Sequence, residues 1–399
     1  MVTQVRHPIW LPAARPPVAR TFATLYALES FARASVASVI PITAYDLLKD
    51  EQSVSMLYTL VALIGLSATL FMPALIDRLA RRWVYSLGVA ALIVAAACFV
   101  TQSLAGQTLG MLARVMGASA MSITLNLYIM DHIRKNDFVT AESMRMAWST
   151  LAWTGGPTLG VFLYSQFGIA AAHGASVVFA LMLLALFWRY RMGDNPVIRP
   201  GRTRPANPLV SVGRFVSQPR LRLAWIIAFG RSCFWTSFFV YGPILMVATG
   251  QGTLAGGLLV SAGNALLFTA IAWGWAGRRF GSRNVMAGCF FGMTLALFAA
   301  GYSGELYPLV TAALLLVCAF FCIAHDSLGS AAFMRTVRAH ERPQMTAVYR
   351  TYLDLSELLP PLAYSLVLAF FGLGGVFATL GAFTAVCGYY TWRYLPRSM

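Results

Sequence analysis

The chain has 399 residues, of which 58% are hydrophobic and 11% are charged, and its formal net charge is +16. Soluble domains carry about 25% charged residues on average, so this composition excludes a soluble protein and indicates an integral membrane protein. The apolar runs are long and continuous, whereas the strands of a membrane barrel alternate and span about ten residues. We therefore expect an all-α membrane protein without a sheet.

A window of about 20 residues, the length that crosses a bilayer, predicts twelve transmembrane helices. In chain order they cover residues 21–44, 54–76, 83–101, 107–131, 143–165, 173–190, 222–247, 253–276, 285–303, 307–331, 346–371 and 374–394. The segment 191–221 is rich in Pro and Arg and has no apolar run. It predicts a linker between two six-helix bundles at 21–190 and 222–394, with tails at 1–20 and 395–399.

The basic residues are distributed unevenly between the predicted loops. One set of alternate loops contains DRLARR, HIRKND, RRFGSR and RTVRAHER, while the other set has Lys49 as its only Lys or Arg. Both termini and the linker are also basic and belong to the first set. Cytoplasmic loops carry an excess of Lys and Arg, so we expect the termini and the linker in the cytoplasm. The net charge then reflects membrane topology, and a nucleic-acid partner is excluded.

Two related segments support the division into halves. PALIDRLARR at 73–82 and GWAGRRFGSR at 274–283 align without a gap, each between the second and third helix of its half. Here the chain resembles the major facilitator superfamily, whose signature at this place is a glycine, an acid four positions on and a basic turn. The matching residues are Asp77, Arg78, Arg81 and Arg82, with Pro73 in place of the glycine. The resemblance implies two pseudo-symmetric bundles that transport solutes and a gating role for these residues.

The stretch GGPTLG in the predicted fifth helix matches the Gly-Pro-x-x-Gly core of a motif associated with exporters in this superfamily. The matching residues are Gly156, Pro157 and Gly160, for which the resemblance implies a gating role. Small residues also let helices pack closely in any membrane bundle, so a purely structural role is the alternative. Arg114 is similar to an arginine that many proton-coupled members carry.

Charged side chains inside a membrane are costly and must face protein or water. Here they occur in the predicted helices 1, 4, 7, 10 and 11, and the resemblance implies that helices 1, 4, 7 and 10 line a central cavity with helix 11 beside them. The residues are Glu29, Arg33, Arg114, Arg231, Asp326, Arg350, Asp354 and Glu357. This agreement indicates a polar translocation path.

Glu29 and Arg33 are four residues apart and therefore share one helix face. The two charges either neutralise each other or form a proton or substrate site. Arg231 has no acid nearby in its own helix, so we expect its counter-charge from another helix or from an anionic substrate. Buried carboxylates are the usual proton carriers, and we assign this role first to Glu29 and second to Glu357.

The remaining candidates are assigned by position. We expect substrate contacts from Arg33, Arg114, Arg231, Asp354, Trp235 and Tyr241, although the two aromatic rings could instead only fill the bundle. Asp326, near the predicted end of its helix, is assigned to a cytoplasmic gate. The chain has no phosphate-binding glycine loop and no metal-ligand spacing, so we expect neither an enzyme nor a bound cofactor or metal.

These features predict a secondary active transporter that moves a small organic solute by alternating access. We expect export of a drug, siderophore or metabolite in exchange for protons, by a monomer in the inner membrane of a bacterium. One alternative is proton-coupled uptake of an anionic metabolite, which an unpaired Arg231 would suit. Another is a sensor or assembly subunit that does not transport.

Overall fold

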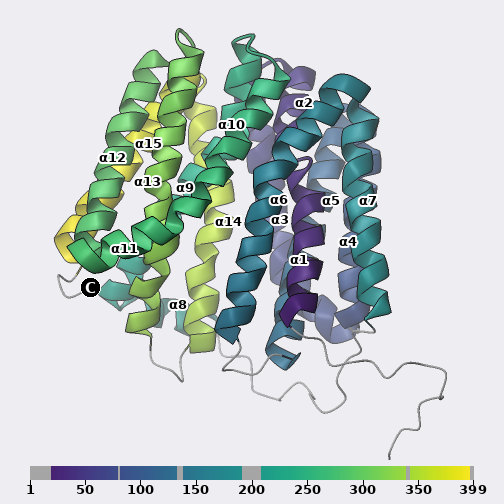
Figure 1. Ribbon diagram of the computed structural model, residues 1–399, viewed down its shortest axis with the longest axis horizontal. Coiled ribbons are helices and arrows are strands. Elements are labelled where there is room, and N and C mark those ends of the chain that lie inside the picture. The colour runs from purple at the N-terminus through teal and green to yellow at the C-terminus, as the bar shows by residue number, and fades with distance from the viewer. Residues whose placement is uncertain (1–18, 80, 133–137, 191–207, 338–341, 396–399) are drawn as a thin grey trace, which may run out of the picture.

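The computed structural model describes residues 19–79, 81–132, 138–190, 208–337 and 342–395, so most of the predicted tails and of the linker lies outside it. Within the described residues the chain is helical and contains no strand (Figure 1). The first half consists of α1 (Ala19–Ala34), α2 (Val39–Leu48), α3 (Glu51–Arg78), α4 (Arg81–Val100), α5 (Leu104–His132), α6 (Phe138–Phe167) and α7 (Ile169–Arg189). The second half consists of α8 (Pro208–Val216), α9 (Pro219–Ala248), α10 (Thr253–Ala265), η1 (Leu266–Thr269), α11 (Ala270–Phe280), α12 (Ser282–Ser303), α13 (Pro308–Thr336), α14 (Arg342–Val367) and α15 (Leu373–Tyr394).

Nine helical segments in the described part of the chain are long and apolar enough to cross a membrane. They cover Arg20–Leu48, Arg81–Val100, Leu104–Ile129, Ile169–Arg189, Pro219–Ala248, Thr253–Phe280, Ser282–Ser303, Pro308–Gly329 and Leu373–Tyr394. Each coincides with a helix predicted from the sequence, with ends that differ by a few residues. The apolar runs alone therefore located these elements.

The helices form two groups that lie side by side in Figure 1. We call α1–α7 the N-terminal bundle and α9–α15 the C-terminal bundle. The bundles are joined where α6 packs against α10, where α3 packs against α14, and where α2 packs against α9. The short helix α2 lies at one end of the molecule and α8 at the opposite end (Figure 1), and these two ends are named after them below.

The first predicted helix is interrupted. The sequence predicts one helix over 21–44, whereas the structure has a turn at residues 35–38 between α1 and α2. Pro41 explains the break, because proline has no N–H to donate to the carbonyl of Ala37 and its ring collides with that carbonyl in a regular helix. The N–H of Ala37 instead donates to the carbonyl of Ala34, three residues back, at 3.1 Å.

The glycines of GGPTLG bring α6 against this break. A Cβ atom on Gly160 would overlap the carbonyl oxygen of Ser35, and one on Gly156 would lie 2.6 Å from the Cβ atom of Ala34. Since only glycine has no Cβ, these two positions allow the backbones of α6 and α1 to touch. Close packing therefore accounts for both glycines, whatever further role the motif has.

The same segment of α6 also contacts the other bundle. The hydroxyl of Thr158 lies 3.3 Å from the carbonyl oxygen of Gly257 and 2.7 Å from the hydroxyl of Ser261, both in α10. A Cβ atom on Gly257 would lie 3.1 Å from the carbonyl oxygen of Pro157. The motif GGPTLG thus connects the broken first helix to the C-terminal bundle.

Candidate translocation site

Glu29 and Arg33 form the ion pair that their spacing allows. Arg33 Nη1 lies 3.3 Å from Glu29 Oε1, and the side chain of Glu29 is 0% exposed while that of Arg33 is 29% exposed. The second carboxylate oxygen of Glu29 has no hydrogen-bond partner within the described residues. Arg145 of α6 lies close enough to attract Glu29 as well. Glu29 is therefore enclosed in the N-terminal bundle, whereas Arg33 is partly exposed.

Arg114 of α5 lies next to this pair. Its Nη2 donates to the backbone carbonyl of Arg33 at 3.5 Å, which places the two guanidinium groups near each other. Tyr58 of α3 is a further neighbour of Arg114. No hydrogen bond or ion pair joins Arg114 to an acidic side chain among the described residues. The positive charge of Arg114 is thus not neutralised directly within its own bundle.

Glu357 of α14 faces these arginines from the other bundle. Its side chain is exposed, and the opposite charges that act on it are Arg33 and Arg114. Asp354, one helical turn away and half-buried, adds a negative charge on the same side. We call Arg33, Arg114 and Glu357 the interbundle charge group. Its members lie on α1, α5 and α14, which are the predicted helices 1, 4 and 11.

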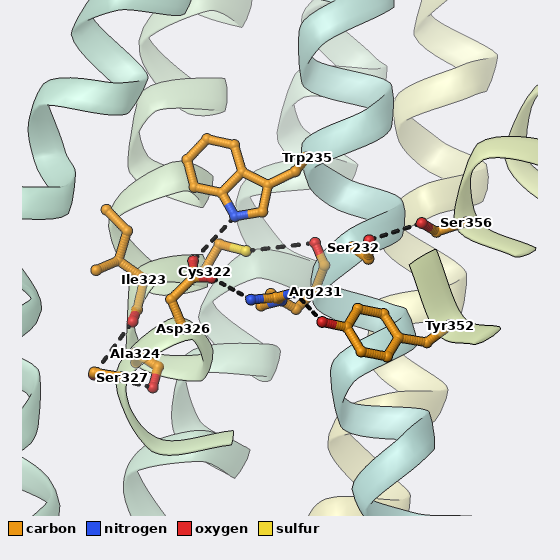
Figure 2. A network of polar contacts seen from close by, with 10 residues as sticks. All are labelled: Arg231, Ser232, Trp235, Cys322, Ile323, Ala324, Asp326, Ser327, Tyr352 and Ser356. Carbon is orange, nitrogen blue, oxygen red and sulfur yellow. Dashed lines mark hydrogen bonds and ion pairs between the residues drawn. The ribbon is translucent and has the colours of Figure 1, made fainter. Parts of the chain in front are cut away.

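A second polar network lies inside the C-terminal bundle (Figure 2). Arg231 Nη1 in α9 lies 2.5 Å from Asp326 Oδ1 in α13, and the indole N–H of Trp235 donates to Asp326 Oδ2 at 3.0 Å. Arg231 Nη2 donates to the hydroxyl of Tyr352 in α14 at 3.1 Å. Both oxygens of Asp326 are therefore occupied. We expected the counter-charge of Arg231 from another helix or from an anionic substrate. The structure shows that it comes from another helix, through Asp326 of α13.

Tyr352 was missed by the sequence reasoning. It lies four residues before Ser356, whose hydroxyl is 2.7 Å from that of Ser232 in α9, so both side chains come from one face of α14. The four-residue spacing of Tyr352 and Ser356, next to Asp354 and Glu357, could have indicated this polar face of α14. Its partners in α9 could not be deduced from spacing within one helix.

Among the described residues, the hydroxyl of Tyr241 bonds to Ser55 and to neither polar group. Its side chain is fully buried, its hydroxyl lies 2.6 Å from that of Ser55 at the start of α3, and its ring packs edge-on against Tyr364 at 5.2 Å between centroids. The hydroxyl of Tyr364 is in turn 2.9 Å from that of Ser237. These contacts join the two bundles near the α2 end, and Tyr241 is packed among them.

The residues assigned to the gate are only partly described. Arg78 and Arg82 are exposed and Arg81 is half-buried, all at the junction of α3 and α4, while the side chain of Asp77 lies outside the described part. Asp326, expected near a membrane face, lies in the network with Arg231 and Trp235 instead of at the end of α13. Among the described residues, no group of three His, Cys, Asp or Glu is placed to hold a metal ion.

Solved structures of low sequence identity share this fold. The nucleoside transporter NupG is 14% identical with a TM-score of 0.72, covering 95% of this chain and 100% of NupG. The POT family transporter PepTSo is 11% identical with a TM-score of 0.73, covering 95% of this chain and 97% of that one. A D-xylose-proton symporter is 12% identical with a TM-score of 0.68, and the coverage is again 95% and 97%.

The sequence itself gives the family. It matches no curated protein. It does match the family model described as Major Facilitator Superfamily over residues 22–268, which is more than half of the chain. The chain therefore belongs to the major facilitator superfamily, and it is a transporter of small solutes and not an enzyme.

Proposed function

We propose that this protein is a proton-coupled secondary transporter in which residues 21–190 and 222–394 move against each other to give alternating access. It crosses the membrane twelve times, with α1 and α2 as one crossing, α10 to α11 as another, and α3–α7, α9 and α12–α15 as one each. The basic loops put the α8 end, both termini and the linker 191–221 in the cytoplasm. The protein acts as a monomer in the inner membrane of a bacterium.

Under this proposal the structure is the inward-facing state. The contact between Ser55 and Tyr241 joins the bundles near the α2 end, which is the outer end in the topology above. A transporter that is shut on the outer side exposes its substrate site to the cytoplasm. The interbundle charge group then belongs to the site that opens inward.

The proposal rests above all on Glu357. This carboxyl group is exposed and faces two arginines of the other bundle, so its charge attracts the N-terminal bundle and its protonation removes that attraction. Glu29, in contrast, has no exposed surface and already has Arg33 as its partner. We therefore assign proton coupling first to Glu357 and second to Glu29, which reverses the order suggested by the sequence.

Export remains the leading direction because of the exporter-like motif at Gly156, Pro157 and Gly160. Uptake of an anionic metabolite is the second candidate, and the observation that favours it is the excess of arginine in the interbundle charge group. Arg231 no longer supports uptake, since Asp326 already neutralises it. In either direction the solute would lie between Arg33 and Arg114 on one side and Glu357 on the other.

The first experiment identifies the solute. Purified protein would be heated with nucleosides, peptides, D-xylose or 5-aminolevulinic acid, which are solutes of transporters with a similar fold, and with other small organic anions and cations. A solute at a hundred times its Kd should stabilise the folded protein by about 2.7 kcal/mol. Candidates that raise the unfolding temperature go forward to transport assays.

The second experiment tests coupling in everted and right-side-out vesicles with an imposed pH gradient. Glu357→Gln should abolish gradient-driven transport but retain exchange of labelled solute, because glutamine keeps the shape and cannot titrate. Glu29→Gln is the matched control, and it should retain pH-driven transport if it folds. Full pH-driven transport by Glu357→Gln would reject the role of Glu357. Accumulation in everted vesicles would indicate export, and accumulation in right-side-out vesicles would indicate uptake.

A further inference from the structure

A small cavity in the N-terminal bundle is lined by Arg114. Its volume is about 10 Å³, and its polar lining comes from Arg114 in α5 and from His173 and Ser176 in α7. The rest of the lining is apolar and consists of Ala32, Val36, Leu92, Ala95, Ala96 and Phe99. Three polar side chains therefore line an otherwise apolar cavity.

Two of these polar groups lack a protein partner among the described residues. They are the Nε of Arg114 and the Nε2 of His173, and both atoms are buried. His173 is 1% exposed, and its ring stacks on Phe99 with 4.8 Å between centroids and 18° between planes. The imidazole is thus held in place by packing while one nitrogen remains available for a hydrogen bond.

The third polar group completes the set. The hydroxyl of Ser176 donates to the backbone carbonyl of Ala32 at 2.6 Å, so its oxygen can still accept a hydrogen bond. A buried water needs a cavity of about 10–15 Å³ or more and two to four polar partners. One water can accept from the Nε–H of Arg114 and donate to His173 Nε2 and to Ser176. The volume and the three partners fit this ligand.

We propose that this cavity binds one water molecule, and that His173 is a positioning residue that holds the guanidinium of Arg114 through this water. The other end of the same guanidinium donates to the carbonyl of Arg33, at the interbundle charge group. His173 thus acts on that group from inside the bundle without touching it. The water site stands on the cavity alone, whereas the effect of His173 on transport rests on the proposed function.

Radiolytic hydroxyl labelling of the full-length protein in nanodiscs tests the water site, because radicals formed from a bound water oxidise the side chains beside it. Phe99 lines the cavity and is 2% exposed, and it should be labelled, whereas Phe377, 0% exposed and outside the cavity, should not. His173→Phe keeps an aromatic ring on Phe99 and removes Nε2, so labelling of Phe99 should fall to the level of Phe377. Equal, slow labelling of both rings in the native protein would overturn the water site.

A second readout follows Arg114 directly. In protein with ¹⁵N-labelled arginine, the Nε–H signal of Arg114, assigned by its loss in Arg114→Lys, should be protected from exchange in the native protein. His173→Phe should remove that protection, and His173→Gln, which keeps a hydrogen-bonding group, should restore it. If His173→Phe is folded and the Nε–H of Arg114 is still protected from exchange, the positioning role of His173 is rejected.

Transport provides the last test and separates the two proposals. With a solute found by the thermal screen, His173→Phe should raise KM and leave kcat unchanged, and His173→Gln should bring KM back toward the native value. An unchanged KM together with lost Arg114 protection would overturn the link to transport and leave the water site supported. Neither the labelling nor the NMR readout requires a solute, so failure of the proposed function would not affect them.

Discussion

The hydroxyl of Ser55 in α3 lies 2.6 Å from the hydroxyl of Tyr241 in α9, and both side chains are buried. The first residue belongs to the N-terminal bundle and the second to the C-terminal bundle, so this hydrogen bond crosses from one bundle to the other. Its place near the α2 end makes it part of the surface that must separate if that end opens.

Tyr241→Phe should therefore weaken the contact between the bundles without disturbing the ring that packs on Tyr364. Loss of one buried hydrogen bond costs about 0.5–1.5 kcal/mol. Thermal unfolding of Tyr241→Phe, Ser55→Ala and the double variant measures the coupling between the two hydroxyls. Strictly additive effects would show that the hydrogen bond contributes nothing, and the closed end would then depend on packing alone.

Asp326→Asn should destabilise the protein strongly, because it leaves Arg231 without a counter-charge inside the C-terminal bundle. Both side chains are 21% exposed, so the expected cost is near the lower end of the range of about 3–5 kcal/mol for a broken buried pair. Adding Arg231→Gln should recover most of this loss, as measured by denaturant unfolding in detergent.

Trp235→Phe is the matched control for that pair. It removes one hydrogen bond to Asp326 but leaves the ion pair, so its cost should be smaller, about 1 kcal/mol. If Asp326→Asn is no more damaging than Trp235→Phe, the charge of Arg231 is being stabilised by something other than Asp326.

Gly160→Ala should prevent normal folding, since the new methyl group would overlap the backbone carbonyl of Ser35 and backbone atoms cannot move aside easily. Overpacking costs about 1–3 kcal/mol and can cost more. Gly155→Ala is the control in the same helix, because nothing lies within 4 Å of a Cβ atom placed there. Size-exclusion profiles of the two variants should differ clearly, and equal yields of monodisperse protein would contradict the proximity of α6 to α1.

Asp50 should make stability depend on acid pH. Its carboxylate caps α3, accepting from the backbone N–H of Ser53 at 2.7 Å and from the Ser53 hydroxyl at 2.5 Å. The Ser53 side chain lowers the pKa of Asp50 below its ordinary value of 3.8. A lowered pKa in the folded state means that this stabilisation is complete above the unfolded pKa and is lost as the pH falls through the folded pKa.

Asp50→Asn should therefore reduce the pH dependence of the unfolding temperature below about pH 4, because asparagine caps a helix but does not titrate. Asp50→Ala should lose about 1 kcal/mol at neutral pH through loss of the cap. A profile for Asp50→Asn that falls with acid as steeply as that of the native protein would assign the acid sensitivity to other carboxyl groups.

Local patterns in the sequence predicted the helices well. The helix expected at 222–247 is α9 (Pro219–Ala248), and the ion pair of Glu29 and Arg33 is one of the two alternatives that their four-residue spacing allows. Such features depend on neighbours within one helix, where apolar length and the helical period decide the outcome. The break at 35–38 could also have been predicted from the sequence, since Pro41 is its local cause.

Contacts between helices could not be predicted in this way. Nothing in α9 indicates that Asp326 neutralises Arg231, that Tyr352 shares the same guanidinium, or that Tyr241 packs against Ser55. These pairings depend on how distant helices are rotated against each other, which is a property of the packed bundle. The proposed order of Glu357 before Glu29 in proton coupling likewise rests on burial, since Glu29 is buried and Glu357 is exposed.

The interruption at residues 35–38 means that the first membrane-crossing segment is not one stiff rod. α1 packs on α6 and α7 of its own bundle, whereas α2 reaches across to α9 of the other. A continuous helix would fix the direction of α2 by that of α1, whereas the turn at residues 35–38 lacks a full set of helical hydrogen bonds and does not impose one common axis. α6 packs closely against this turn. The interruption therefore lies between α1, which packs within the N-terminal bundle, and α2, which also contacts the C-terminal bundle.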